Sequence, residues 1–320
     1  GSHMSKTVCL IGAFDTKGAE YAYLVQQIQA VGHEVLALNF GVMGTTDLFP
    51  VYIEADEVAQ AGGTTLAALR AASDRGAAMQ AMHDGVAALT AHLHESGRIA
   101  GAIGMGGSGG TSVITAGLRV LPLGFPKVCI STTASGNTAP YVGTRDIVLF
   151  PSIVDVAGVN RISRLIMSRA VAALLGMVNA PVPAPEADRP IVLASMFGNT
   201  AACVDQCRAL LDAAGYEVLV FHAVGSGGRS LEDLARQAYA AGVLDITTTE
   251  WADALCGGIF SAGTERLDGP GQAGIPHLIV PGCIDMVNFG GIETVPQQDR
   301  QRKLYEWDPQ GTLIRTTGEE

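Results

Sequence analysis

The fold of this chain is decided by one stretch, Gly104-Met105-Gly106-Gly107-Ser108-Gly109-Gly110-Thr111-Ser112. An apolar run, residues 99–103, precedes it, and residues 113–121 follow with apolar spacing that suits a helix. We therefore predict a strand, a glycine-rich loop and a helix in succession. Glycine lets the backbone approach a ligand closely, and the first amides of a helix favour an anion. The stretch predicts a phosphate-binding corner, and the alternative is a tight turn that requires small residues.

Strand and helix patterns alternate on both sides of this corner. Upstream, residues 8–12 and 34–40 predict strands, and a helix between them would take Asp15 or Thr16 as its N-cap. Apolar side chains spaced by three and four residues between Met79 and Leu93 predict a long amphipathic helix that packs on the core. Downstream, further strands are predicted at residues 127–130 and 146–150, and a further helix at residues 159–175. This alternation is typical of a doubly wound parallel sheet.

The chain is predicted to contain two domains of this kind. Residues 179–190 hold four prolines and almost no bulky apolar side chain, which indicates a linker between a domain of residues 5–178 and a domain of residues 191–320. The segment after the linker resembles the first strand and its turn, and it carries a second glycine corner, Gly225 to Gly228. The fold class is therefore α/β, with two tandem Rossmann-like doubly wound parallel-sheet domains facing a cleft.

Composition limits the partners. The formal net charge is −11 and the pI is about 5.0, without a basic cluster, so nucleic acid is not an expected partner. No uninterrupted apolar run approaches the ~18 residues of a membrane span, and no secretory segment precedes the first strand, so we expect a cytoplasmic protein without a membrane partner. The apolar composition favours a homo-oligomer. The six cysteines are expected to be buried thiols rather than disulfides or metal ligands, and no metal site is predicted.

Several residues at predicted carboxyl ends of strands are candidate ligand contacts. The hydroxyls of Thr132, Thr133 and Ser135 could contact a phosphate or ribose, or they could cap a turn. Asp15 and Lys17 could contact a base edge or a phosphate, although Asp15 could instead only cap its helix.

Two familiar motifs fit the corner in part. Gly104, Gly106 and Gly109 match the dinucleotide fingerprint, but no acid follows the next strand to hold a ribose, so NAD is disfavoured, and a Walker A motif is absent. Gly106, Ser108 and Gly110 also match a nucleophile elbow. In that alternative, Asp146 or Asp155 and His222 or His277 would complete a catalytic triad.

The chain also resembles a known family. The residues that carry the resemblance are the segments 11–18, 106–112, 221–228 and 284–290, which occur in order over nearly the whole chain. They are similar to the Tm-1-like ATP-binding domain family, UPF0261. The resemblance implies tandem Rossmann-like domains and ATP binding, and because relatives usually continue further, it implies that a closing segment of the second domain is missing. The ATP contacts that it implies are Gly106, Gly107, Ser108, Gly109, Gly110, Thr111, Ser112, Asp15, Lys17, Thr132, Thr133 and Ser135.

Three functions are compatible with these observations. The first is a cytoplasmic protein that binds ATP, with or without Mg²⁺, in the interdomain cleft. The second is an enzyme of the hydrolase, isomerase or lyase type that acts on a small phosphorylated or carboxylated metabolite. There the two glycine corners would each hold an anionic end, with Asp15, His222 or Asp285 as the acid or base. The third is a binding or inhibitory module in which ATP is a structural clamp. The sequence does not decide whether the protein is an enzyme.

Overall fold

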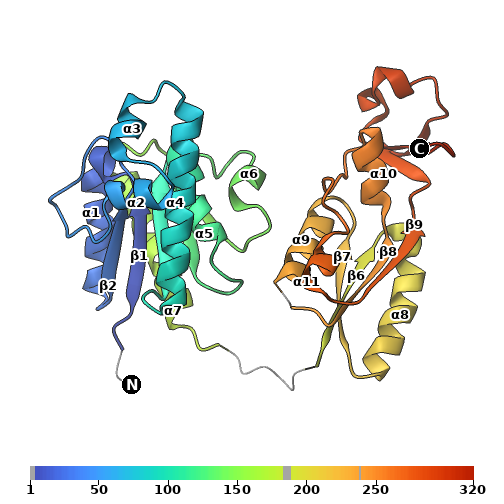
Figure 1. Cartoon of the computed structure of the whole chain (residues 1–320), viewed down its shortest axis with the longest axis horizontal. Helices are drawn as coiled ribbons and strands as arrows, with labels where there is room; N and C mark the ends of the chain where they lie inside the picture. The colour runs from blue at the N-terminus through green and yellow to red at the C-terminus, as the bar shows by residue number, and fades with distance from the viewer. Residues whose placement is uncertain (1–3, 183–188, 238) are drawn as a thin grey trace. The chain divides into compact units, whose positions relative to one another are not determined.

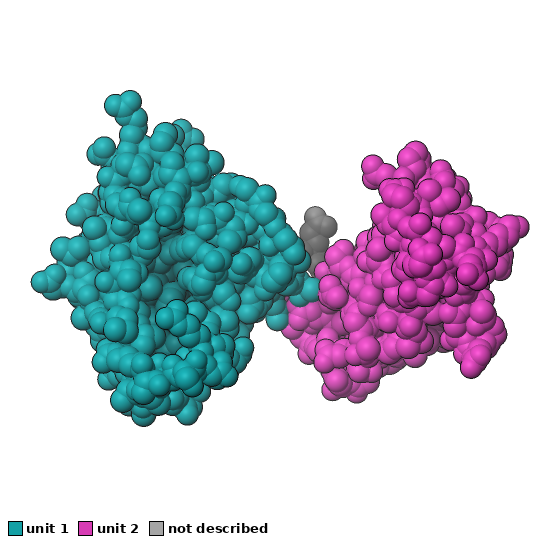
Figure 2. All heavy atoms as spheres, turned by 90° about the horizontal axis from the view of Figure 1, so that it is seen from above, with its two compact units in different colours: residues 1–182 teal, residues 183–320 magenta. Residues whose placement is uncertain are grey.

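The computed structural model describes residues 4–182, 189–237 and 239–320. The chain divides into two compact units, residues 1–182 and residues 183–320 (Figure 2), and each is described by itself. The division falls within the proline-rich stretch that we predicted as a linker, residues 179–190, of which residues 183–188 lie outside the described residues.

Unit 1 contains a parallel five-stranded sheet in the order β2-β1-β3-β4-β5. The strands are β1 (Thr7–Gly12), β2 (Glu34–Asn39), β3 (Gly101–Gly106), β4 (Lys127–Ser131) and β5 (Val148–Pro151). In this order the chain reverses its direction of winding between β1 and β3. Open α/β sheets bind their ligands at such a point, outside the carboxyl ends of the strands.

Helices cover both faces of this sheet (Figure 1). They are α1 (Phe14–Ala30), α2 (Ala55–Ala61), α3 (Leu66–Ala71), α4 (Arg75–Glu95), α5 (Ser108–Arg119), α6 (Ala139–Val142) and α7 (Arg161–Asn179). The first and last, α1 and α7, pack together on one face, and α2, α4 and α5 pack on the other. The predicted doubly wound α/β fold is confirmed for this unit.

Three local predictions need correction in unit 1. The glycine-rich loop is shorter than predicted, because β3 continues to Gly106, where it pairs with Ser131, and α5 already begins at Ser108. Neither Asp15 nor Thr16 caps α1, since the N-cap is Ala13 and has no side-chain cap. In the predicted apolar stripe of α4, Met79 is exposed rather than buried.

One helix of unit 1 resembles a membrane span in composition. Among the described residues, only α7 is long and apolar enough to cross a membrane by length and composition. Arg164 and Arg169 interrupt its apolar run, so the sequence did not predict a membrane span there. One face of α7 is buried in the core of unit 1, whereas Ile162 and Leu165 are exposed.

Unit 2 combines a parallel and an antiparallel sheet. The parallel sheet has the order β7-β6-β8-β9, and the antiparallel sheet has the order β10-β12-β11. The strands are β6 (Ile191–Met196), β7 (Glu217–His222), β8 (Gly242–Thr247), β9 (His277–Gly282), β10 (Met286–Phe289), β11 (Tyr305–Asp308) and β12 (Gly311–Arg315). The α-helices are α8 (Ala201–Ala213), α9 (Ser226–Arg236), α10 (Thr249–Cys256) and α11 (Gly269–Ala273). The parallel part was predicted, and the antiparallel sheet was not.

The cysteines follow the prediction only in part. All six are free thiols. Cys9 and Cys129 are buried, and burial raises the pKa of both thiols to about 12. Cys203 is exposed, because it lies on a face of α8 that is turned away from the sheet core, and the other three are half-buried.

Candidate functional site

The sheet of unit 1 opens at the point where its winding reverses. The pairing of β1 with β3 ends at Ile11 and Gly104. Beyond it, the buried hydroxyl of Tyr21 accepts a hydrogen bond from the Met105 amide at 3.2 Å and contacts the Met105 carbonyl. The Tyr21 side chain of α1 therefore replaces the backbone hydrogen bonds between β1 and β3 at this point. The connections after β1 and β3 separate at the carboxyl end of the sheet.

The start of α5 presents free amides at this opening. Within the described residues, the backbone amides of Ser108, Gly109 and Gly110 have no hydrogen-bond acceptor, as is usual for the first turn of a helix. The Thr111 amide already donates to the Gly107 carbonyl at 2.8 Å, so it is not available to a ligand. The Gly107 amide also has no acceptor among these residues, so the predicted anion-binding range of residues 106–112 narrows to the amides of residues 107–110.

Three glycines of this corner, Gly107, Gly109 and Gly110, are not required by packing, whereas a Cβ atom would lie 2.5 Å from its nearest neighbour at Gly104 and 3.1 Å at Gly106. A Cβ atom would lie 3.8 Å from the nearest atom at Gly107 and 4.0 Å at Gly109, and at Gly110 it would meet nothing within 4 Å. None of the three has a positive φ. Glycine in a helix costs about 0.5–1 kcal/mol relative to alanine. Packing and backbone conformation therefore do not require glycine at these three positions.

A cleft of about 640 Å³ adjoins these amides. Gly109 and Gly110 form part of its wall, together with Asp15 and two arginines, Arg70 and Arg75. The remaining wall is largely apolar and includes Phe40, Val42, Leu69, Met79, Met82 and Val113. Its volume lies in the range of small-molecule sites, about 300–1,000 Å³. The cleft can therefore accept a ligand with an anionic end and an apolar, planar part.

The charged groups of the cleft differ in whether they already form hydrogen bonds within the protein. Arg70 donates through Nε to the Val42 carbonyl at 2.8 Å, whereas Arg75, the first residue of α4, makes no hydrogen bond or ion pair within the part of the chain that the structure describes. Oδ2 of Asp15 accepts from the Met43 amide at 3.1 Å, and its Oδ1 is buried without a partner among the same residues. The site thus offers a free cation to an anion and a free carboxylate oxygen to a donor.

A buried asparagine holds the loops of this cleft. Asn39, at the end of β2, accepts hydrogen bonds from the Phe14 and Gly41 amides at 2.9 and 2.8 Å. Its amide nitrogen donates to the Gly44 carbonyl and to Glu54. Because α1 already begins at Phe14, Asp15 lies within its first turn, and its carboxylate lines the cleft instead of capping the helix.

The structure brings only some of the predicted hydroxyls to the corner. Thr132 lies beside Gly107, and its hydroxyl has no hydrogen bond within the described ranges. The hydroxyls of Thr111, Ser131 and Thr133 instead form a chain of hydrogen bonds at 2.6 and 2.7 Å. Ser135 is exposed.

Two further predicted ligand contacts, Lys17 and Ser112, already form hydrogen bonds within the protein. The ammonium group of Lys17 donates to the Val156 carbonyl. The Ser112 hydroxyl lies 2.9 Å from Nε2 of His83, and burial followed by the nearby Arg119 charge lowers the pKa of that histidine.

The second glycine corner is already filled by the protein itself. Residues 225–228 repeat the tetrapeptide Gly-Ser-Gly-Gly of residues 107–110, and both copies lead into a helix. In unit 2, the Gly225 and Gly228 amides donate to Oε2 of Glu250 at 2.8 and 3.0 Å. The hypothesis that this corner holds an anionic end of a substrate is therefore wrong in this structure, because a carboxylate of the chain occupies those amides.

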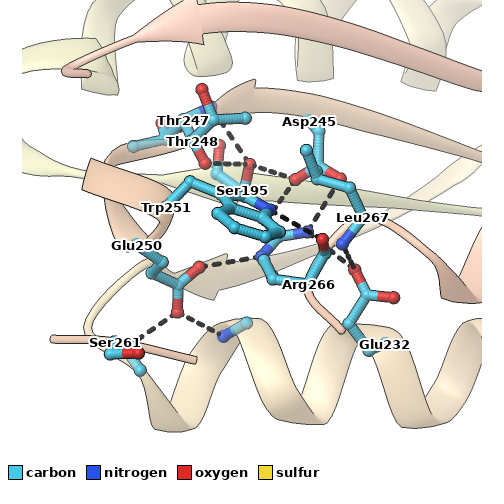
Figure 3. A network of polar contacts seen from close by, with 12 residues as sticks. Ser195, Glu232, Asp245, Thr247, Thr248, Glu250, Trp251, Ser261, Arg266 and Leu267 are labelled. Carbon is cyan, nitrogen blue, oxygen red and sulfur yellow. Dashed lines mark hydrogen bonds and ion pairs between the residues drawn. The ribbon is translucent and has the colours of Figure 1, made fainter. Parts of the chain in front are cut away.

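Glu250 belongs to a buried charge network (Figure 3). The guanidinium of Arg266 contacts Glu232, Asp245 and Glu250, and all four side chains are almost fully buried. Burial raises the pKa of Glu250. Burial also opposes ionisation of Asp245, but hydrogen bonds from His277 and Arg266 outweigh it and lower the pKa of Asp245. These contacts indicate a structural role for the network.

The parts of a serine hydrolase triad are engaged elsewhere. Within the described residues, the Ser108 hydroxyl has no histidine partner, Asp146 pairs with Lys127, and His277 pairs with Asp245. The other acid or base candidates are exposed: the His222 ring lies 5.5 Å from that of Phe197, and Asp285 faces Arg315 at 3.4 Å. No group of three or more metal-ligating side chains occurs among the described residues.

Comparison with known proteins identifies the family. The models of the uncharacterised protein family UPF0261 match the chain with their N-terminal domain over residues 6–183 and their C-terminal domain over residues 189–320. The chain belongs to the UPF0261 family. A UPF0261 protein of Clostridium tetani is 45% identical over 317 residues, which cover 99% of this chain and 78% of the relative. One from Mesorhizobium japonicum is 43% identical over 98% of this chain and 78% of its own.

A plant protein is also similar to this UPF0261 chain. The ToMV resistance protein Tm-1(GCR237) of Solanum lycopersicum is 44% identical over 248 residues, or 76% of this chain and 33% of the plant protein. The resemblance found in the sequence is therefore confirmed at the level of the family.

Sequence reasoning missed three residues of this UPF0261 site. Arg70 and Arg75 lie between the second strand and the long helix, a region without a recognisable motif, and only the placement of α3 and α4 brings them to the glycines. Asn39 ends β2, which was predicted as residues 34–40, and a polar side chain near a strand's carboxyl end was a signal that could have found it.

Proposed function

We propose that unit 1 binds a nucleotide, with ATP as the first candidate. The phosphates lie against the amides of Ser108, Gly109 and Gly110, where the helix dipole and Arg75 favour negative charge. The planar base packs against the apolar wall that includes Met79 and Met82. Oδ1 of Asp15 accepts a hydrogen bond from a ribose hydroxyl or an amino group of the ligand.

The observation that carries this proposal is the contrast between the two Gly-Ser-Gly-Gly corners. In unit 2 two amides of the corner bind the carboxyl group of Glu250, with a φ of 92° at Gly225 where Gly107 in unit 1 has a φ of −79°. In unit 1 the corresponding amides, those of Gly107 and Gly110, have no acceptor among the described residues, and Gly110 lines a cleft whose wall includes the unpaired Arg75. An external anion is the partner that this corner lacks.

The donor set is also compatible with Mg²⁺. This ion prefers carboxylate and phosphate oxygens, and it usually retains several waters. The free oxygen of Asp15 is a ligand of that kind, and ATP would supply the others. ATP affinity is therefore expected to rise when Mg²⁺ replaces a chelator in the buffer.

Calorimetric titration with ATP and Mg²⁺ tests the proposal. Arg75→Ala removes a charge-assisted hydrogen bond, so it should weaken binding by about tenfold or more. Gly107→Val places a branched side chain at the corner and should also weaken binding. Arg161→Ala is the matched control, because Arg161 is likewise an exposed first residue of a helix, and it should bind as the wild type does. Unchanged affinity in both site variants would place any ATP site elsewhere.

Thermal-shift measurements with other ligands separate this proposal from its alternatives. A bound ligand stabilises the folded chain according to its concentration relative to its Kd. Stabilisation by sugar phosphates or keto acids, but not by ATP, would favour an enzyme that acts on a small metabolite. Tight ATP binding without turnover would favour a module in which ATP is a structural clamp.

A further inference from the structure

Unit 2 contains a pocket of its own, separate from the glycine corners. Its volume is about 420 Å³, which is also in the range of small-molecule sites. It lies where the antiparallel sheet meets the carboxyl ends of β6 and β7. Its wall consists of Phe197, Gly198, Asn199, His222, Val224, Phe260, Met286, Asn288, Phe289, Trp307, Asp308, Gln310, Gly311 and Leu313.

Aromatic rings from separate segments converge on this pocket. Phe197 follows β6, His222 ends β7, Phe260 follows α10, and Trp307 lies on β11. The Phe197 ring lies 6.4 Å from that of Phe260, and the indole of Trp307 is 77% exposed. Aromatic pairs gain free energy beyond the burial of their area, and an indole left in water can gain it from a ligand ring.

The polar groups of the pocket select the charge of its ligand. Asp308 is the one carboxylate among the described residues that line it, and none of them is Lys or Arg. Oδ1 of Asp308 accepts from the Gln310 amide at 2.7 Å, which fixes its orientation and leaves the other oxygen free. The side-chain amides of Asn199 and Gln310 also make no hydrogen bond within the described part of unit 2. These amides can both donate and accept, so the free oxygen of Asp308 is the group that favours a donor or a cation over a phosphate or carboxylate.

We propose that this pocket binds a small aromatic molecule with a positively charged or hydrogen-bond-donating substituent. The ring packs between Trp307, Phe197 and Phe260, and the substituent points to Asp308. This ligand is distinct from the nucleotide proposed for unit 1, so either proposal can fail without the other.

Tryptophan fluorescence measures this binding directly. The chain contains two tryptophans, and Trp251 is held by a hydrogen bond from its Nε1 to the Arg266 carbonyl, so a pocket ligand should affect mainly the exposed Trp307. The probes are phenethylamine and 3-phenylpropionate, which have the same ring and spacer but opposite charge. Phenethylamine should shift the emission to the blue in a saturable way. It should bind about tenfold more tightly than 3-phenylpropionate, because an exposed carboxylate attracts one and repels the other.

Variants connect the signal to the pocket. Trp307→Phe should abolish the fluorescence change and leave Trp251 emission unaltered. Asp308→Asn keeps the acceptor for Gln310 but should remove the preference for the amine, whereas Glu306→Gln, on the same strand but outside the wall, should keep it. The proposal is overturned if fluorescence and calorimetry detect no saturable binding of phenethylamine. Equal affinity for both probes, or a fluorescence change that survives in Trp307→Phe, also overturns it.

Discussion

Gly110→Ala is expected to stabilise unit 1 and to weaken its ligand binding at the same time. Gly110 lies in the first turn of α5, its φ is not positive, and a Cβ atom there would meet nothing within 4 Å. Alanine should therefore add about 0.5–1 kcal/mol to the free energy of unfolding. For a unit of 182 residues, this corresponds to a rise in Tm of about 1–4 °C.

The same methyl group occupies the space in which the proposed phosphate lies. If ATP affinity falls tenfold, ATP at 100 times the wild-type Kd stabilises the variant by about 1.4 kcal/mol instead of about 2.7 kcal/mol. The ATP-induced rise in Tm should therefore be halved, although the Tm without ATP is higher. Differential scanning calorimetry with and without ATP measures both quantities.

Gly176→Ala is the matched control for this experiment. Gly176 is an exposed residue of α7 with open space around it, so alanine should stabilise the unit to a similar extent. The ATP-induced shift should remain that of the wild type. If Gly110→Ala and Gly176→Ala keep the same ATP shift, the space above Gly110 is not a ligand site. If Gly110→Ala lowers the Tm without ATP, Gly110 has a packing role in the folded unit.

Two further predictions concern stability. Gly85→Ala should lower the free energy of unfolding by about 1–3 kcal/mol, because its Cβ atom would lie 2.0 Å from the Val58 carbonyl oxygen and force α2 away from α4. Urea titrations followed by circular dichroism measure this loss. An effect as mild as that of an exposed helical glycine would contradict the prediction. Asp245→Asn should lower the free energy of unfolding by about 3–5 kcal/mol at pH 7, because it leaves the buried charge of Arg266 incompletely paired. The pKa of Asp245 in the folded chain is lowered from its ordinary 3.8, so the stabilisation by its carboxylate is present above pH 3.8 and is lost as the pH falls through the folded pKa. Urea unfolding followed by tryptophan fluorescence should show that the difference in unfolding free energy between variant and wild type narrows at that pH. A difference that stays constant with pH would be evidence against this role.

Local patterns in the sequence predicted much of the architecture. The alternation of apolar strands with helices gave the parallel sheets of both units, because it depends on which face of each element is apolar. The antiparallel sheet was missed, since its strands β10 and β11 have only four residues each and show too little periodicity to predict. The capping role of Asp15 was predicted wrongly, because α1 begins one residue before it, at Phe14, with Ala13 as the N-cap.

The sequence by itself identified two glycine corners, in residues 104–112 and 225–228, and predicted that the first of them leads from a strand into a helix. Only the tertiary structure decided which of them is open. Glu250 reaches back to the second corner from 22 residues further along the chain, whereas α3 and α4 place Arg70 and Arg75 around the first. The physical reason is that the direction of an amide follows from the local backbone, whereas its hydrogen-bond partner comes from segments that are distant in sequence. Those segments meet only when the chain folds.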